Sequence, residues 1–307
     1  MNKKAALFLI IVFLLAGGVI YFKQRGSNSV NNSQTQKVVV AATIFPLSDI
    51  TRQIGGDLIE VKNILPSGAS PHTFELRPSD IAGLRSAKII FAIGNNLDSW
   101  VDEAVQNSSQ ARLVSVDQGV QLKNFPPLDA SLESSEAGGI DPHYWLSIIN
   151  ARLIARTITD NLIALQPENA DEFNNNLKQY QGELDSLETE MKGLLSDKRI
   201  GDLIVFHESW AYFADEFGLT IAGVFEPRPG QEPTPKYLQA LYKSAKDHNV
   251  KVVFTEPQLA SDLINPFVQD LGLSISTLDP LGGSGQRDSY INMMRYNARE
   301  IHNAFIK

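Results

Sequence analysis

The 307-residue chain contains no cysteine, and it has only five histidines, four methionines and three tryptophans. The absence of cysteine excludes disulfide bonds and every metal site that depends on thiolate ligands. Any metal ion bound by this protein must therefore be held by nitrogen and oxygen atoms. A chain without free thiols also suits an oxidising compartment outside the cytoplasm.

The chain also has no excess of positive charge. It contains 27 Lys and Arg and 35 Asp and Glu, which give a net charge of -8. Nucleic-acid binding requires a basic face, so we expect no nucleic-acid partner, whereas a cation is compatible with this charge. The proportions of apolar and charged residues, 43% and 20%, are typical of a soluble globular protein. The length allows two domains of ordinary size.

Long hydrophobic runs are absent except at the start, where residues 5–22, AALFLIIVFLLAGGVIYF, follow the basic MNKK. This run is either a cleaved signal peptide or a retained anchor, and eighteen residues are near the lower limit for crossing a bilayer. No clear A-x-A cleavage site follows, and Gly18 stands where a lipoprotein would carry its acceptor cysteine. We expect a signal or membrane anchor over residues 1–25, with the remaining chain outside the cytoplasm in either case.

The rest of the chain alternates between strand-like and helix-like segments. Residues 26–36, GSNSVNNSQTQ, form a polar tether with too little apolar surface to fold. Short apolar, β-branched runs then predict strands, at residues 37–45, 59–65, 87–94, 112–117, 202–208, 219–225, 250–256 and 273–279. Strands that alternate with helices indicate parallel βαβ units. The sequence therefore predicts an α/β fold with two lobes, over residues 37–166 and 198–307, each with a mostly parallel sheet flanked by helices.

A long amphipathic helix is predicted between the lobes, over residues 167–197. Apolar residues recur there at steps of three and four, namely Phe173, Leu177, Tyr180, Leu184, Leu187, Met191 and Leu194. Such a helix would be ~45 Å long at 1.5 Å per residue. It could be half of a helical hairpin or a rigid strut that joins the lobes.

Three histidines and one aspartate occupy related positions. His72 lies in the Pro-containing loop after the second predicted strand, His143 lies in DPHYWL ahead of a helix, His207 ends LIVFH, and Asp279 follows ISTL. In an open parallel sheet, ligands bind beyond the carboxyl ends of the strands, so these side chains could converge in a cleft between the lobes. Taken singly, each histidine could equally be a solvated loop residue, and Asp279 could form a turn.

Four sequence blocks make the interpretation more specific: PHTFELRPSDIAGLRSAKIIFAIGNNLDSWV, DPHYWL, VFHESWAYFADEFGL and TLDPLGG. In content and order they resemble the zinc/manganese class of solute-binding proteins that serve ABC importers, the TroA-like metal receptors. The likeness runs from about residue 38 to the C-terminus. It implies two α/β lobes bridged by a backbone helix, a membrane permease as partner, and His72, His143, His207 and Asp279 as the metal ligands.

The ligand set implied by the resemblance has three imidazoles and one carboxylate. Zn²⁺ favours nitrogen ligands and four-coordination, whereas Mn²⁺ prefers more oxygen, so we expect Zn²⁺ as the transported ion with Mn²⁺ as the alternative. Related manganese binders commonly have glutamate at the third position, where this chain has His207. Carboxylates should orient the imidazoles, and the candidates are Asp141, Glu208, Glu226, Glu232 and Glu256.

The sequence differs from many members of the resembled family in two ways, and two other functions are possible for it. Residues 123–139 contain no histidine, so the His-rich loop of many zinc members is not expected, and residues 5–22 would replace a lipid anchor. A zinc metallohydrolase is disfavoured because four protein ligands would close the shell and because HESWA has Ala211 where a zincin has its second histidine. We therefore expect no enzymatic activity. A surface adhesin remains an alternative, and we expect a monomer.

Overall fold

The computed structural model describes residues 37–108, 111–125, 139–227, 231–259 and 261–306. The predicted anchor over residues 1–25 and the predicted tether over residues 26–36 lie outside the described residues. Within the described ranges, no helix is both long enough and apolar enough to cross a bilayer. Residues 38–307 form one compact unit.

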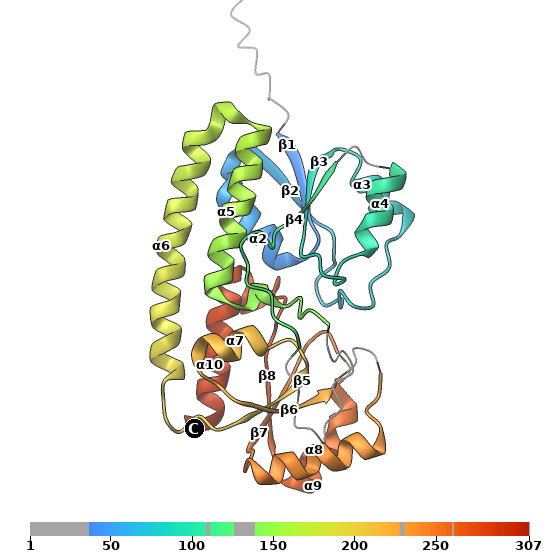
Figure 1. Cartoon of the computed structure of the whole chain (residues 1–307), viewed down its shortest axis with the longest axis vertical. Helices are drawn as coiled ribbons and strands as arrows, with labels where there is room; N and C mark the ends of the chain where they lie inside the picture. The colour runs from blue at the N-terminus through green and yellow to red at the C-terminus, as the bar shows by residue number, and fades with distance from the viewer. Residues whose placement is uncertain (1–36, 109–110, 126–138, 228–230, 260, 307) are drawn as a thin grey trace, which may run out of the picture. The chain divides into compact units, whose positions relative to one another are not determined.

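The N-terminal half is built on a four-stranded parallel sheet with the order β2-β1-β3-β4 (Figure 1). Its strands are β1 (Val38–Ala42), β2 (Ile59–Asn63), β3 (Ala87–Ala92) and β4 (Arg112–Ser115). Both faces are covered, as parallel sheets require. One face packs on α2 (Phe45–Gly55) and α5 (Ile148–Leu165), and the other faces α3 (Pro78–Gly83) and α4 (Trp100–Ser108).

The C-terminal half repeats this arrangement with the order β6-β5-β7-β8, again all parallel. Its strands are β5 (Leu203–His207), β6 (Ile221–Glu226), β7 (Val252–Thr255) and β8 (Ser274–Thr277). Alternate residues of β5 point to opposite faces, so Ile204 and Phe206 pack under α8 (Pro235–Asp247) and α9 (Asn265–Leu271), whereas Val205 joins the larger core. The prediction of two α/β lobes with eight strands is confirmed.

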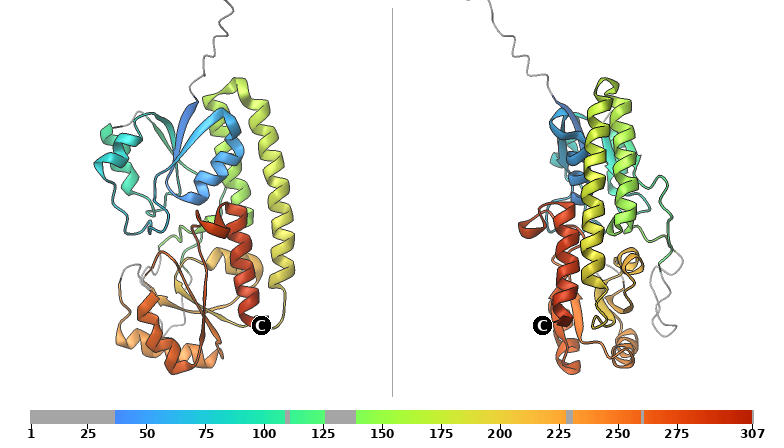
Figure 2. Two further views of the ribbon diagram at one scale, coloured as in Figure 1. Left: turned by 180° about the vertical axis from the view of Figure 1, so that it is seen from behind. Right: turned by 90° about the vertical axis from the view of Figure 1, so that its left-hand side faces the viewer.

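The long helix is α6 (Ala170–Leu195), which follows the short 3-10 turn η3 (Pro167–Asn169). It packs against α5 and α2 near one end and against α7 (Ala211–Phe217) and α10 (Tyr290–Ile306) near the other (Figures 1 and 2). Both predicted roles therefore hold, because α6 pairs with α5 as a hairpin and also spans the two halves. The α-helix begins three residues later than predicted because Pro167 opens the 3-10 turn.

One apolar core runs along these helices from one half to the other. A single cluster of buried side chains contains Ile50 of α2, Ile154 of α5, Leu184 of α6 and Met293 of α10, all 0% exposed. Ion pairs at the rim join the same helices, with Arg152 of α5 contacting two acidic residues of α6. Partly exposed ion pairs contribute at most about 1 kcal/mol each, so the shared apolar core holds the halves together.

The remaining short 3-10 segments lie in the connections. They are η1 (Gly56–Leu58), η2 (Tyr144–Leu146), η4 (Ser261–Ile264) and η5 (Gly285–Arg287). Two of them, η2 and η5, flank the loops that carry predicted site residues. The segment η2 directly follows His143, and η5 lies in the connection after Asp279.

Candidate metal site

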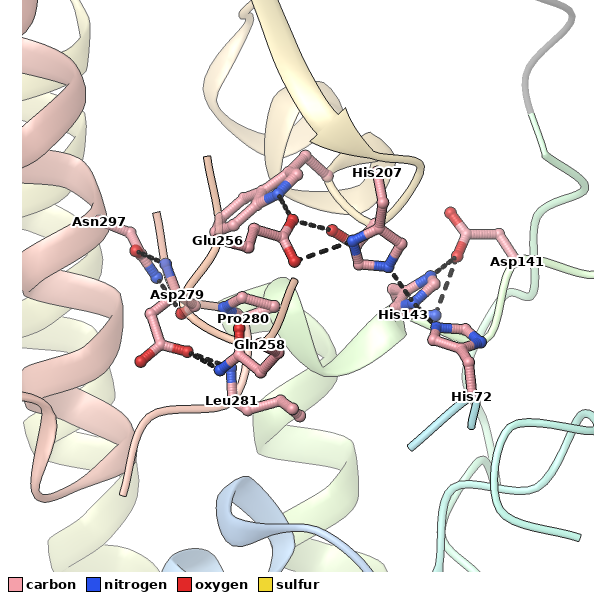
Figure 3. A network of polar contacts seen from close by, with 12 residues as sticks. His72, Asp141, His143, His207, Glu256, Gln258, Asp279, Pro280, Leu281 and Asn297 are labelled. Atoms are coloured by element: carbon pink, nitrogen blue, oxygen red, sulfur yellow. Dashed lines mark hydrogen bonds and ion pairs between the residues drawn. The ribbon is translucent and has the colours of Figure 1, made fainter. Parts of the chain in front are cut away.

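Three of the four predicted ligands meet at the boundary between the halves (Figure 3). His72 comes from the loop after β2, His143 immediately precedes η2, and His207 is the last residue of β5. His143 and His207 are buried, and His72 is partly buried. One ligand nitrogen from each ring lies within 4.8 Å of the other two. His143 is 71 positions after His72 and 64 positions before His207, yet the three side chains form one cluster.

The spacing of the nitrogens matches a tetrahedral ion. The His143 Nε2 atom is 3.2 Å from Nε2 of His72 and 3.3 Å from Nε2 of His207. Two ligands at about 2.0–2.1 Å from a tetrahedral Zn²⁺ lie about 3.3 Å apart. Two of the three separations therefore match the edges of a coordination tetrahedron, and the ligand atoms of His72 and His207 lie within 4.8 Å of each other.

Buried carboxylates orient two of the rings. Asp141 Oδ1 lies 2.8 Å from Nδ1 of His143 and also accepts the His143 backbone N–H at 2.9 Å. Glu256 Oε2 lies 2.8 Å from Nδ1 of His207. The other oxygen of Glu256 accepts from the indole N–H of Trp210 at 2.9 Å. An ionised carboxylate can only accept, so both Nδ1 atoms carry the hydrogen and both Nε2 atoms face the centre of the cluster.

This arrangement is suited to a cation. When His143 and His207 are neutral, their Nε2 lone pairs point at each other across 3.3 Å with no hydrogen between them, which is unfavourable in a buried site. A neutral His72 can donate to His143 Nε2 in its Nε2–H tautomer, at 3.2 Å. With the His72 hydrogen on Nδ1, a divalent ion satisfies the Nε2 lone pairs of all three rings together. A proton on one ring is the other way to relieve the contact, so the ion and the proton compete for the same atoms.

The three histidines differ in how readily they accept that proton. Burial lowers the pKa of His72 to about 2, with the other two imidazoles adding to the effect, and burial also holds the pKa of His143 well below its ordinary value. Burial likewise disfavours charge on His207, but the Glu256 carboxylate outweighs this and raises the His207 pKa. Burial raises the pKa of Asp141 to about 7. The competing proton therefore belongs to His207.

The loop that carries His72 is fixed by its own contacts. The Pro71 carbonyl accepts a hydrogen bond from the indole N–H of Trp100 at 3.1 Å, and Phe74 packs edge-on against the same indole. Proline restricts the backbone directly ahead of His72. The Trp100 contacts and the restricted Pro71 backbone together limit the conformations of the loop that presents His72.

A cavity beside the histidines joins residues of both halves. Its lining is made by Ser70, Pro71, His72, His143, Trp145, His207, Glu256, Gln258, Leu259, Pro280 and Leu281. A second cavity, with Asn95 and Asn96 in its wall, also reaches His72. Of the three histidines, His72 alone lines both cavities.

Asp279, the fourth predicted ligand, does not join the cluster. It is buried beyond β8, and its Oδ1 accepts from Gln258 Nε2 at 2.7 Å and from the backbone N–H groups of Leu281 and Gly282. Its Oδ2 forms an ion pair with Arg287 Nε at 3.0 Å. In Figure 3 the carboxylate lies beside the Gln258 amide and away from the histidines. The structure thus brings together three of the predicted ligands and holds the fourth elsewhere.

Of the five carboxylates proposed to orient the rings, Asp141 and Glu256 do so. Glu226 raises the pKa of His207 through its charge, and Glu232 is exposed. Sequence reasoning did not identify the roles of Gln258 and Arg287. No spacing pattern links them to Asp279, because the contacts depend on how the loops after β7 and β8 fold together.

The fold and the site define a class of protein, a two-lobed α/β protein with a candidate metal site of three imidazoles at the boundary between its halves. Residues 40–304 match the family model described as zinc-uptake complex component A, periplasmic. The chain belongs to this family of metal-binding substrate-binding proteins of ABC transporters. Members of the family are receptors, so the expectation that this protein is not an enzyme is confirmed.

Relatives named for two different ions resemble the chain equally well. It is 28% identical to the manganese ABC transporter substrate-binding lipoprotein PsaA of Streptococcus mitis, with 100% of both chains covered. It is 27% identical to the high-affinity zinc uptake system protein ZnuA of Bacillus subtilis (strain 168), covering 99% of this chain and 98% of the relative. The names therefore support metal binding and leave the choice of ion to the site.

Solved structures agree with the fold. A crystal structure of ZnuA superimposes with a TM-score of 0.77 at 30% identity, covering 87% of this chain and 99% of the other. A ZnuA deletion mutant with zinc bound gives a TM-score of 0.76 at 29% identity, covering 88% and 98%. The laminin-binding adhesin of Streptococcus agalactiae, at 23% identity and a TM-score of 0.76, shares the fold.

Proposed function

We propose that this protein captures Zn²⁺ outside the cytoplasm and delivers it to the membrane permease of an ABC importer. The observation that carries the proposal is the pair of Nε2 separations, 3.2 and 3.3 Å, among three imidazoles of which two are oriented by carboxylates. Nitrogen ligands in tetrahedral spacing suit Zn²⁺ better than Mn²⁺. Residues 5–22 would tether the receptor to the membrane, and the receptor would act as a monomer.

Mn²⁺ is the second candidate, because relatives named as manganese receptors match the chain over its full length. The role of Asp279 as a fourth ligand stays a prediction. It would add the oxygen that Mn²⁺ prefers, but the carboxylate would first have to leave Gln258 and Arg287.

The test is competitive titration of the full-length chain in mild detergent, with native mass spectrometry and elemental analysis of the bound ion. We expect one ion per chain and retention of Zn²⁺ when Mn²⁺ is present in excess. His143→Ala should lose most of the affinity for Zn²⁺. Removal of His248, which pairs with Asp202 away from the site, is the matched control and should change nothing. Absence of Zn²⁺ binding, or full binding by His143→Ala, would contradict the proposal.

A further inference from the structure

The start of α7 lies behind both of the carboxylates that orient histidine rings. Trp210, directly before α7, donates its indole N–H to Glu256, the carboxylate that orients His207. Two residues further on, the Tyr212 hydroxyl donates to the backbone carbonyl of Asp141 at 3.1 Å. One short stretch of the C-terminal half therefore supports the orienting partners of both buried histidines.

The Tyr212 hydroxyl makes two hydrogen bonds, and both go to the segment that leads into His143. It accepts the backbone N–H of Lys123 at 2.8 Å and donates to the Asp141 carbonyl, so its single donor is used. Tyr212 is buried, and burial raises its pKa to about 12. The hydroxyl therefore keeps its proton, and remains a donor to Asp141, throughout the physiological pH range.

The two residues that Tyr212 contacts face each other across a short antiparallel ribbon. The Asp141 N–H donates to the Lys123 carbonyl at 2.8 Å, and the next pair, Asn124 and Ile140, forms an isolated bridge. A two-stranded ribbon is at best marginally stable by itself in water. Because the Tyr212 hydroxyl bonds to both strands of the ribbon, it fixes the ribbon on α7.

Two other contacts also hold this ribbon. The Lys123 ammonium pairs with Asp215 of α7, but the side chains are 38% and 71% exposed, so the pair contributes little. Phe125 is buried, and its ring lies edge-on to the His143 ring with 6.3 Å between the centres. Neither contact involves the Asp141 backbone, to which Tyr212 bonds directly.

The position of the Asp141 backbone determines the direction of the His143 ring. Asp141 Oδ1 lies 2.9 Å from the backbone nitrogen of His143 and 2.8 Å from its Nδ1 atom (Figure 3). On the other side of His143, the buried segment η2 holds the chain in place. A shift of Asp141 would therefore turn the ring and move its Nε2 atom away from the other imidazoles.

We propose that Tyr212 is a positioning residue, which holds the His143 ring at the cluster by fixing the Asp141 backbone on α7. His143 belongs to the N-terminal half by chain order, yet this contact ties it to the half that supplies His207. The Nε2 atoms of the two buried histidines are thereby kept 3.3 Å apart. This inference rests on the proposed function, since it concerns how the proposed metal ligands are held.

The experiment is a double-mutant cycle with Tyr212→Phe, Asp141→Ala and the two changes combined, in the full-length chain in mild detergent. Zn²⁺ affinity is measured by competition with a chelator. Tyr212→Phe keeps the ring and removes the hydroxyl, so affinity should fall about tenfold. Without the Asp141 carboxylate the hydroxyl has nothing to orient, so the same change should cost less than about twofold in the Asp141→Ala background.

Tyr237→Phe is the matched control. The Tyr237 hydroxyl donates to the Val224 carbonyl at 2.7 Å, and the ring packs with Phe206, whose side chain points away from that of its neighbour His207. Both tyrosine variants should unfold at a lower temperature than the wild type in the absence of metal. Only Tyr212→Phe should also lose Zn²⁺ affinity, which a general loss of stability does not explain.

A measurement on the wild type tests the inference even if Tyr212→Phe does not fold. Zn²⁺ should slow amide hydrogen exchange in residues 123–125 and 139–141 more than in the edge strand β4, because the ribbon and His143 are held together. Equal slowing in the two regions would overturn the inference.

Two outcomes of the cycle would also overturn the inference without affecting the proposed function. One is a folded Tyr212→Phe protein that binds Zn²⁺ like the wild type. The other is a loss of the same size in both backgrounds, which would mean that Tyr212 acts independently of the Asp141 carboxylate. A wild-type protein that does not bind Zn²⁺ would instead refute the proposed function.

Discussion

The two halves of the molecule have the same strand order, yet they contribute to the site in different ways. The C-terminal half supplies His207 from the end of β5 and Glu256 from just beyond the neighbouring strand β7, so ligand and orienting carboxylate come from paired strands. The N-terminal half supplies His72 from a loop, partly buried and lining both cavities. The C-terminal half thus provides one ligand from a strand end, whereas the N-terminal half provides two ligands from loops, the buried His143 and the partly exposed His72.

The pKa values of His207 and His72 are shifted in opposite directions. The pKa of His207 is raised by the Glu256 carboxylate, whereas the pKa of His72 is lowered to about 2 by burial and by its imidazole neighbours. His207 therefore binds a proton more tightly than a free imidazole does, and His72 binds it less tightly. His207, at the end of β5, is the ligand that exchanges a proton for the ion, whereas His72, in the loop after β2, adds a neutral nitrogen to the coordination shell.

The largest expected effect comes from deleting one ligand at a time. His207→Ala removes one ligand and leaves Glu256 Oε2 without its His207 partner, so Zn²⁺ affinity should fall by about three orders of magnitude. His72→Ala leaves the two oriented rings in place, and we expect a loss about tenfold smaller. Competition with a chromophoric chelator measures both. Equal losses in the two variants would remove the distinction between the halves.

A smaller effect is expected from the residue that orients His207. Glu256→Gln keeps the shape but removes the hydrogen bond to Nδ1, so Zn²⁺ affinity should fall by about 10- to 100-fold. Trp210 and Ser209 donate to Glu256 Oε1 and can still donate to the amide oxygen, which limits structural damage. The amide NH2 then takes the place of Oε2 and faces the His207 Nδ1–H, so the orienting hydrogen bond is lost. If Glu256→Gln binds Zn²⁺ like the wild type, the ring is held by packing alone.

The smallest expected effect is the response to pH. The raised pKa of His207 means that its proton persists to higher pH, so an ion must displace it, and affinity falls as pH drops below that pKa. His72 and His143, with lowered pKa values, have no proton to lose near neutrality. Asp141, whose pKa burial raises to about 7, can release a second proton when the ion binds. The slope of the logarithm of the Zn²⁺ affinity against pH should therefore lie between one and two protons, and a slope of three would contradict this assignment.

Much of the fold was predictable because its signals are local. Buried strands such as Val38–Ala42 and Leu203–His207 are short apolar runs, and the α6 stripe repeats at helical spacing. The convergence of His72, His143 and His207 followed from their positions near strand ends together with the resemblance to known receptors. These features depend on chain order and periodicity, which a sequence records directly.

The rest depends on contacts that no local pattern encodes. Glu256 lies 49 residues after His207, and the two meet because β7 pairs with β5 rather than with β6. Asp279 was placed correctly beyond β8, but its commitment to Gln258 and Arg287 arises from the folding of two loops. The structure brings the three imidazoles together, their role as metal ligands stays a prediction, and the sequence did not indicate the carboxylate's other partners.

The apolar core shared along α5, α6 and α10 also bears on how the molecule loses its structure. Two lobes with separate cores could melt one after the other, each at its own temperature. Each half also has a smaller apolar cluster on one face of its sheet, but the cluster common to both halves couples them, so the described residues should unfold in a single cooperative transition. An ion held at the boundary then stabilises both halves at once, by an amount set by its concentration relative to its dissociation constant.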